Sequence, residues 1–250
     1  MEYVYRPVLA LARVVFKAQG IRFDISGAEN VPRTGGAVMA INHTGYMDFT
    51  YAGYAALPSK RLVRFMAKES IFGHRVSGPL MRGMKHIPVD RNAGAGSFRA
   101  AVNALKAGEI VGVFPEATIS LSFELKEFKS GTVRMAQAAG VPILPVTIWG
   151  SQRVWTKNHP KRLGRTNIPV LLTIGEPIEA PRKGDAEAIN THLHTVMTTQ
   201  LHEQQSRYPT LTGDDLKFVP ARLGGTAPTP EEAAIREAHS MKRTRDEFTG

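Results

Sequence analysis

The 250-residue sequence contains no cysteine. This absence excludes disulfide frameworks, thiolate nucleophiles and zinc sites with sulfur ligands. Long apolar runs are also missing, because stretches such as 140–152 fall short of the roughly 20 residues with which a helix crosses a bilayer. In the first 20 residues, Arg13 and Lys17 interrupt the apolar pattern and no small-residue cleavage site follows, so we expect no secretory signal. These absences favour a cytoplasmic protein without a membrane span.

Positive charge is abundant and unevenly distributed. The formal net charge is +10 and the isoelectric point is about 10.0. Residues 1–165 contain 23 Lys and Arg against 10 Asp and Glu, whereas residues 166–250 contain 9 against 12. We therefore expect an anionic partner (a membrane, a nucleic acid or a phosphorylated substrate) to meet the first two thirds of the chain. A basic surface that is merely solvated remains the alternative.

Apolar segments alternate with helical patterns along the chain. Strands are predicted at 22–26, 37–42, 64–67, 86–89, 110–114, 143–149 and 170–174. Helices are predicted at 48–56, 76–83, 97–107, 131–139 and 185–206. This alternation indicates a single α/β domain with a mainly parallel central sheet flanked by helices. We expect an N-terminal amphipathic helix over 1–20, the α/β domain over 21–208, and a linker with a short charged helix over 209–250.

The N-terminal segment has the pattern of a basic amphipathic helix. Pro7 suits the first turn of a helix and Gly20 suits the position after its end. Arg6, Arg13 and Lys17 fall within one narrow sector, and apolar side chains cover the remaining face. Such a helix can lie in a lipid interface, or it can pack on its own domain.

The segment 41–48, with the sequence INHTGYMD, contains the candidate catalytic residues. An apolar strand ends at Asn42, and His43 and Asp48 follow in the turn where α/β proteins place reactive groups. A nearby carboxylate fixes the tautomer of a histidine and stabilises its protonated form. Without a cysteine or a G-x-S-x-G turn, we interpret His43 as a general base. Taken alone, the pair is weak evidence, and an ordinary loop histidine is the favoured interpretation.

Three further segments follow in order. Residues 86–91 read HIPVDR, residues 114–120 read FPEATIS and residues 141–146 read VPILPV. With the N-H-x-x-x-x-D pattern of residues 42–48, their order and spacing resemble the four motifs of the glycerolipid acyltransferase superfamily, in its PlsC-type 1-acylglycerol-3-phosphate acyltransferase branch. The second motif of that branch ends in V-D-R, matched by Val89, Asp90 and Arg91. The resemblance covers residues 20–175.

The resemblance implies an O-acyltransferase of phospholipid biosynthesis. Such an enzyme transfers a fatty acyl group to the sn-2 hydroxyl of 1-acylglycerol-3-phosphate and yields phosphatidic acid. His43 would deprotonate the hydroxyl and Asp48 would orient the imidazole, without an acyl-enzyme, a cofactor or a metal. The co-substrate would be acyl-CoA or acyl carrier protein. The acceptor would be bound by Asn42, Arg91, Glu116, Ala117, Thr118 and Lys129. From the residues alone, Arg91 could instead pair with Asp90, and Glu116 could cap a helix.

The third motif departs from the family pattern F-P-E-G-T-R-S. Ala117 stands where the family has glycine, and Ile119 stands where it has arginine. A phosphate that loses an arginine loses charge-assisted hydrogen bonds, each worth roughly 1.5–3 kcal/mol. Either other cations such as Lys126 and Lys129 bind the phosphate, or the acceptor is another glycerol phosphate or lysophospholipid.

Two basic regions suggest how the protein meets its substrates. Residues 60–91 contain eight Lys and Arg against two acids, interleaved with apolar side chains, which suits contact with anionic lipid. Residues 153–165 contain five cations and Trp155, and could contact headgroups, CoA phosphates or a carrier protein. We therefore predict a peripheral protein on the cytoplasmic face of the membrane. A nucleic-acid-binding protein is the non-enzyme alternative, although no recognisable nucleic-acid module is present.

Overall fold

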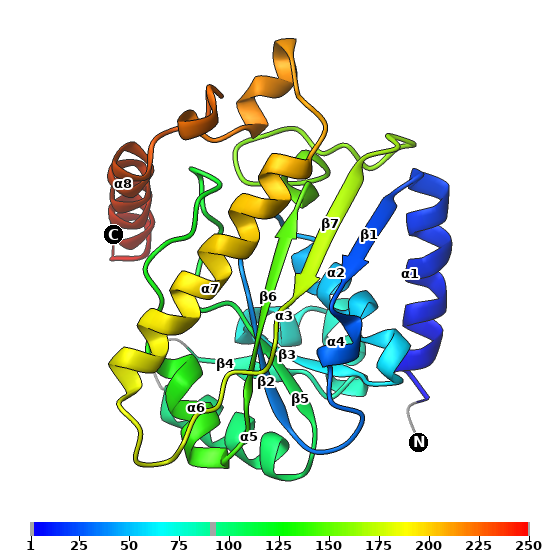
Figure 1. Cartoon of the computed structure of the whole chain (residues 1–250), viewed down its shortest axis with the longest axis vertical. Helices are drawn as coiled ribbons and strands as arrows, with labels where there is room; N and C mark the ends of the chain where they lie inside the picture. Colours follow the sequence, from blue (N-terminus) through cyan, green and yellow to red (C-terminus); the bar gives the residue numbers. More distant parts are fainter. Residues whose placement is uncertain (1–2, 91–93, 250) are drawn as a thin grey trace.

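A computed structural model of the chain describes residues 3–90 and 94–249, with side chains through residue 239. A seven-stranded sheet forms the centre, and helices pack around it (Figure 1). The strands are β1 (Arg22–Ser26), β2 (Ala37–Ile41), β3 (Val63–Lys68), β4 (Ile87–Val89), β5 (Ile110–Val113), β6 (Ile143–Trp149) and β7 (Pro169–Ile174). The α-helices are α1 (Tyr5–Gln19), α2 (Asp48–Ala55), α3 (Glu69–Gly73), α4 (Ser77–Gly83), α5 (Gly94–Lys106), α6 (Gly131–Ala139), α7 (Ala186–Arg207) and α8 (Pro230–Thr249).

The sheet has the strand order β1-β7-β6-β2-β5-β3-β4. The β6–β7 pair is antiparallel and the other five pairs are parallel. The predicted α/β fold with a mainly parallel sheet is therefore confirmed, and each predicted strand is present. Helix α5 begins at Gly94, three residues before its predicted start, because Gly94 and Gly96 have low helix propensity and mask the first turn.

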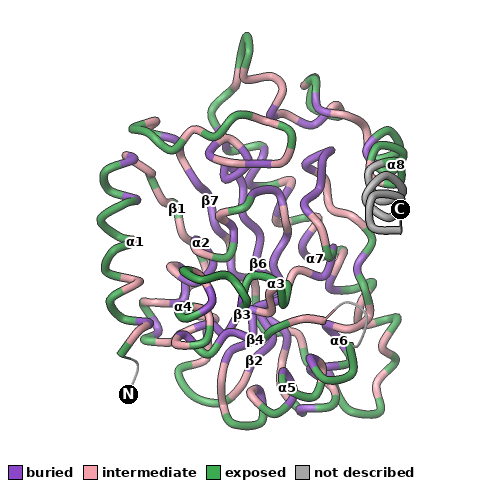
Figure 2. Tube along the Cα trace, turned by 180° about the vertical axis from the view of Figure 1, so that it is seen from behind, coloured by how far each residue is buried: buried purple, intermediate pink, exposed green. Residues whose placement is uncertain are grey.

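The sheet separates two hydrophobic cores. Side chains alternate along a strand, so Met39 and Ile41 of β2 face a core that also contains Phe16 of α1 and Tyr51 of α2. Val38 and its neighbours on the opposite face pack against α5, α6 and α7. Strands β2, β5 and β6 are buried along their whole length (Figure 2). Because these three strands are adjacent and parallel, their C-terminal ends meet at one edge of the sheet.

Helix α1 has two different apolar faces. On one face, Tyr5 and Phe16 are buried, and the Tyr5 hydroxyl donates a hydrogen bond of 2.7 Å to the Val63 carbonyl. On another face, Leu11 and Val14 are 63% and 65% exposed. The helix therefore packs on its own domain and still presents apolar side chains to its surroundings. Among the residues that the structure describes, no helix combines the length and apolar character of a membrane span.

The C-terminal region folds back onto the domain. Phe218 and Ala227 join a third hydrophobic cluster with Trp149 of β6 and Leu201 of α7. After this cluster, α8 lies on the side of the molecule opposite α1 (Figure 1). An ion pair of 2.5 Å between Glu237 of α8 and Lys126 links this helix to the segment that follows β5.

Candidate active site

His43 and Asp48 form a hydrogen-bonded pair at the C-terminal edge of the sheet. The distance between His43 Nδ1 and Asp48 Oδ2 is 3.0 Å. The backbone N–H groups of Thr44 and Gly45 donate to the same oxygen at 2.8 Å each. Asp48 is fully buried in the first turn of α2, where the helix dipole favours a negative charge. The loop between β2 and α2 therefore folds around the carboxylate and orients it toward the imidazole.

Ser151 completes the set of hydrogen bonds to Asp48. Its hydroxyl donates to Asp48 Oδ1 and lies 3.2 Å from the Thr44 hydroxyl. Thr156 in turn donates a hydrogen bond of 2.6 Å to the Thr44 carbonyl. Ser151 is not among the site residues predicted from the sequence. Its position two residues after β6, at the edge where His43 lies, is the signal that could have identified it.

The imidazole of His43 is partly exposed. Its ring stacks on Phe114, with centroids 4.1 Å apart and planes inclined by 25°. Nδ1 is engaged by Asp48, whereas Nε2 has no hydrogen-bond partner among residues 3–90 and 94–239. An imidazole held in this way can accept a proton at Nε2 while the Asp48 carboxylate stabilises the resulting positive charge.

Glu116 connects the first and third motifs. One of its carboxyl oxygens accepts a 2.7 Å hydrogen bond from the His43 backbone N–H, and the other accepts a 3.1 Å bond from the Lys126 backbone N–H. Burial raises the pKa of Glu116 to about 8, although these two N–H donors lower it in part. The Ser120 backbone N–H also donates to the His43 carbonyl, at 2.8 Å. The third motif therefore supports the backbone of the predicted base.

The remaining predicted binding residues lie around this loop. Asn42 is fully buried, and its amide pairs with the backbone of Ile148 through bonds of 3.0 and 2.7 Å. Thr118 accepts a 2.6 Å hydrogen bond from Lys126 Nζ, and Lys129 is exposed. Substrate contact by Asn42, Glu116, Ala117, Thr118 and Lys129 stays a prediction; the structure shows positioning contacts for Asn42 and Glu116.

Two further expectations concern the second motif and metals. Arg91 lies outside the described residues, and its neighbour Asp90 donates a backbone hydrogen bond of 3.3 Å to Ser97. Across the described part of the chain, no group of three His, Cys, Asp or Glu residues is arranged to bind a metal ion.

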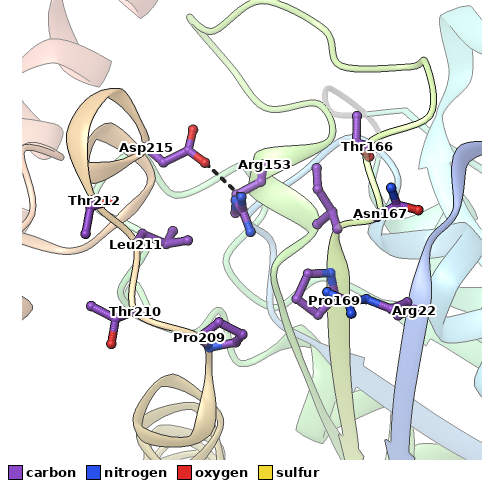
Figure 3. Close-up of a pocket in the computed structure, with 11 residues that line it drawn as sticks. Arg22, Arg153, Thr166, Asn167, Pro169, Pro209, Thr210, Leu211, Thr212 and Asp215 are labelled. Atoms are coloured by element: carbon purple, nitrogen blue, oxygen red, sulfur yellow. Dashed lines mark hydrogen bonds and ion pairs between the residues drawn. The ribbon is translucent and has the colours of Figure 1, made fainter.

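A separate polar hollow of about 340 Å³ is lined by residues near the start of β7. Figure 3 shows Arg153 in its wall, joined to Asp215 by a 2.8 Å ion pair, with Arg22 and Pro169 nearby. Its lining includes none of the predicted site residues, so it is distinct from the His43–Asp48 pair.

A partly exposed imidazole, oriented by a buried carboxylate at the edge of a mainly parallel sheet, defines an α/β protein equipped for base-catalysed group transfer. Comparison with protein families identifies the family to which the chain belongs. A family model described as "Acyltransferase" matches residues 22–149, which is half of the chain. The chain belongs to this acyltransferase family and is an O-acyltransferase. The resemblance to PlsC-type enzymes is thereby confirmed.

Individual relatives have related descriptions. The chain is 32% identical to a 1-acyl-sn-glycerol-3-phosphate acyltransferase of Bacillus subtilis over 154 residues, covering 60% of this chain and 70% of that protein. A protein of the same description from Borreliella burgdorferi is 28% identical over 145 residues, which span 56% of each chain. The chain is also 30% identical to an uncharacterised protein of Mycobacterium tuberculosis over 248 residues, covering 84% of this chain and 66% of that one.

A solved structure supports the fold. The crystal structure of the 1-acyl-sn-glycerophosphate (LPA) acyltransferase PlsC from Thermotoga maritima superposes with a TM-score of 0.63. It is 24% identical to this chain and covers 79% of it, with 81% of the Thermotoga chain matched. At this level of identity the likeness establishes the shared α/β architecture.

Proposed function

We propose that this protein transfers a fatty acyl group from a thioester donor to the sn-2 hydroxyl of 1-acylglycerol-3-phosphate, producing phosphatidic acid. The observation that carries the proposal is the His43–Asp48 pair, whose Nε2 is left for an incoming hydroxyl. The Bacillus and Borreliella relatives are both 1-acyl-sn-glycerol-3-phosphate acyltransferases, which supports this acceptor. The donor is acyl-CoA or acyl carrier protein.

The proposed reaction uses one base. His43 Nε2 removes the proton of the acceptor hydroxyl, and the hydroxyl oxygen attacks the thioester carbonyl carbon. The tetrahedral intermediate collapses with cleavage of the carbon–sulfur bond, and the thiolate takes the proton back from the imidazolium. Asp48 stabilises the imidazolium between these two proton transfers. Because both substrates are bound in line with each other, no acyl-enzyme is required.

We also propose that the enzyme works at the surface of an anionic membrane. The exposed face of α1 offers Leu11 and Val14 beside Arg13, the combination that an interfacial helix needs. The α3–α4 region adds Ile71, Val76 and Leu80, which are exposed near several cations. Lipid acceptors reside in such a membrane, so adsorption would bring the enzyme to its substrate.

The decisive experiment is an acyl-transfer assay with a panel of lysolipid acceptors. The purified protein is given palmitoyl-CoA, oleoyl-CoA or the corresponding acyl carrier protein thioesters. We expect transfer to 1-acylglycerol-3-phosphate at the sn-2 position, reduced about 100-fold or more in His43→Ala. Asp48→Asn should lower kcat and leave the acceptor KM nearly unchanged. Transfer to a different lysophospholipid, with none to 1-acylglycerol-3-phosphate, would contradict the proposed acceptor.

A further inference from the structure

We propose that Lys126 binds the phosphate of the acceptor, and that Glu237 of α8 occupies Lys126 while the acceptor is absent. The C-terminal helix would thus carry an internal competitor for the phosphate subsite. This inference rests on the proposed function, because it assigns the phosphate subsite of that reaction.

The contacts of Lys126 place its ammonium group beside the third motif. Nζ donates to the Thr118 hydroxyl at 2.6 Å and to Glu237 Oε2 at 2.5 Å. The Lys126 backbone N–H and the His43 backbone N–H are hydrogen-bonded to the two oxygens of one carboxyl group, that of Glu116. A single carboxyl group therefore separates the Lys126 backbone from that of the base. A phosphate at Nζ and the Thr118 hydroxyl would lie next to the reacting end of the acceptor.

Other residues of this loop are less suited to bind the phosphate of the acceptor. Ile119, at the family's arginine position, is buried in the protein, so the departure from the motif removes a cation without opening a polar site. Lys129 is exposed and, among the described residues, makes no hydrogen bond to Thr118. Lys126 is 27% exposed and already holds an acidic group, which makes its ammonium a formed anion site.

The contact with Glu237 has the properties of an exchangeable one. Glu237 is 12% exposed, and its second oxygen, Oε1, is buried with no hydrogen-bond partner among residues 3–90 and 94–239. A buried acceptor that lacks a donor costs free energy, so this carboxylate is bound incompletely. A phosphate monoester brings up to two negative charges and three acceptor oxygens to the same donors. It can therefore replace the carboxylate, and α8 can release Lys126 by a small displacement.

The test measures binding without donor, so that no turnover occurs. Equilibrium dialysis is performed with a short-chain 1-acylglycerol-3-phosphate, glycerol 3-phosphate and inorganic phosphate. We expect Glu237→Gln to bind the lipid about threefold more tightly or better, because the competitor loses its charge. The matched control Glu127→Gln removes the same charge from an exposed neighbour and should change affinity less than about twofold. Lys126→Met should weaken binding about tenfold or more, and Lys126→Arg should restore most of the affinity.

A double variant separates competition from a structural effect. In the Lys126→Met background, Glu237→Gln should no longer tighten binding, because the two residues act on one site. The inference would be overturned if Glu237→Gln and Glu127→Gln changed affinity equally, or if Lys126→Met bound the lipid with wild-type affinity. It would also be overturned if neither the wild type nor any variant bound the lipid, or if only the binding of inorganic phosphate responded to the substitutions. Normal transfer to 1-acylglycerol-3-phosphate without these binding effects would refute this inference alone. The expected binding effects with transfer only to another phosphate-bearing acceptor would refute the proposed function alone.

Discussion

The Asp48 carboxylate is a buried charge whose two oxygens are both hydrogen-bonded. His43, the backbone of Thr44 and Gly45, and Ser151 supply the donors. A buried carboxylate is costly unless hydrogen bonds replace its lost hydration. These donors also prevent the carboxylate from rotating, so the imidazole has one defined orientation. At the scale of single residues, we therefore expect catalysis to depend on groups that do not touch the substrate.

Ser151→Ala tests this dependence. The substitution leaves Asp48 Oδ1 without its side-chain donor in a fully buried site, and we expect kcat to fall about tenfold. The pH profile of kcat should shift as well, because Asp48 then stabilises the imidazolium differently. Steady-state kinetics across pH measures both effects. The exposed Ser206→Ala is the control, and an unchanged pH profile in Ser151→Ala would show that Ser151 only fills space.

Ala117 illustrates the cost of a departure from a motif. Its φ angle is +63°, in the left-handed region that favours glycine, which the family has at this position. We expect Ala117→Gly to raise the free energy of unfolding by about 0.5–1 kcal/mol, because the strain exceeds the entropy that glycine adds to the unfolded chain. Calorimetry should detect a rise in Tm of about 1–4 °C. A lower Tm would mean that the loop is not strained.

His43 and Asp48 could be predicted because their chemistry and spacing lie within one short segment. The contacts of Ser151 with Asp48 and of Glu116 with His43 could not, because they join residues 103 and 73 positions apart. Such contacts depend on which strands become neighbours. The order β6-β2-β5 brings the three segments to one edge, and hydropathy patterns alone do not specify strand order.

Among the elements, the buried strands were the most predictable. β2, β5 and β6 are almost entirely apolar, as is typical of strands with both faces covered. The antiparallel direction of β7 was not predictable, since it depends on the path of residues 150–168. Helix α3 has five residues, too few to show a helical period.

His86 connects several of these elements and makes stability depend on pH. Its Nδ1 accepts a 3.0 Å hydrogen bond from the Phe65 backbone of β3, and its ring meets Tyr5 of α1. Burial, and then the nearby Arg64 charge, lower the pKa of His86 from 6.5 to about 4. Below pH 6.5, His86 is therefore protonated in the unfolded chain, whereas in the folded protein it becomes protonated only near pH 4.

His86→Gln should reveal this linkage, because glutamine can keep an acceptor for the Phe65 N–H without titrating. The stability advantage of wild type over the variant should shrink by up to about 2–3 kcal/mol between pH 6.5 and pH 4. Above pH 6.5 the difference should be constant. Urea unfolding at a series of pH values measures it, and a constant difference across the whole range would disprove the assignment.

At the scale of the whole molecule, α1 and α8 lie on opposite sides of the protein (Figure 1). The first two thirds of the chain carry the excess positive charge, and α1 adds exposed apolar side chains to it. The α1 side is therefore the one that we expect to face an anionic membrane. Deleting residues 1–17 would be an ambiguous test, because Tyr5 and Phe16 belong to the packed interior.

Substitutions on the exposed face of α1 avoid that ambiguity. The double variant Leu11→Glu and Val14→Glu places charge where we propose that lipid lies, while Tyr5 and Phe16 keep their packing. We expect binding to vesicles rich in anionic lipid to fall about tenfold or more, since apolar burial and electrostatic attraction are both lost. Wild-type binding should weaken with salt, because the Debye length falls to about 10 Å at 0.1 M. Ile235→Glu on α8, also an exposed apolar position, is the matched control and should bind like wild type.

Transfer to a short-chain, water-soluble acceptor should survive in all variants, because His43 and Asp48 are untouched. Vesicle flotation and the soluble assay together decide the matter: full binding by the α1 double variant would make α1 a packing element and nothing more.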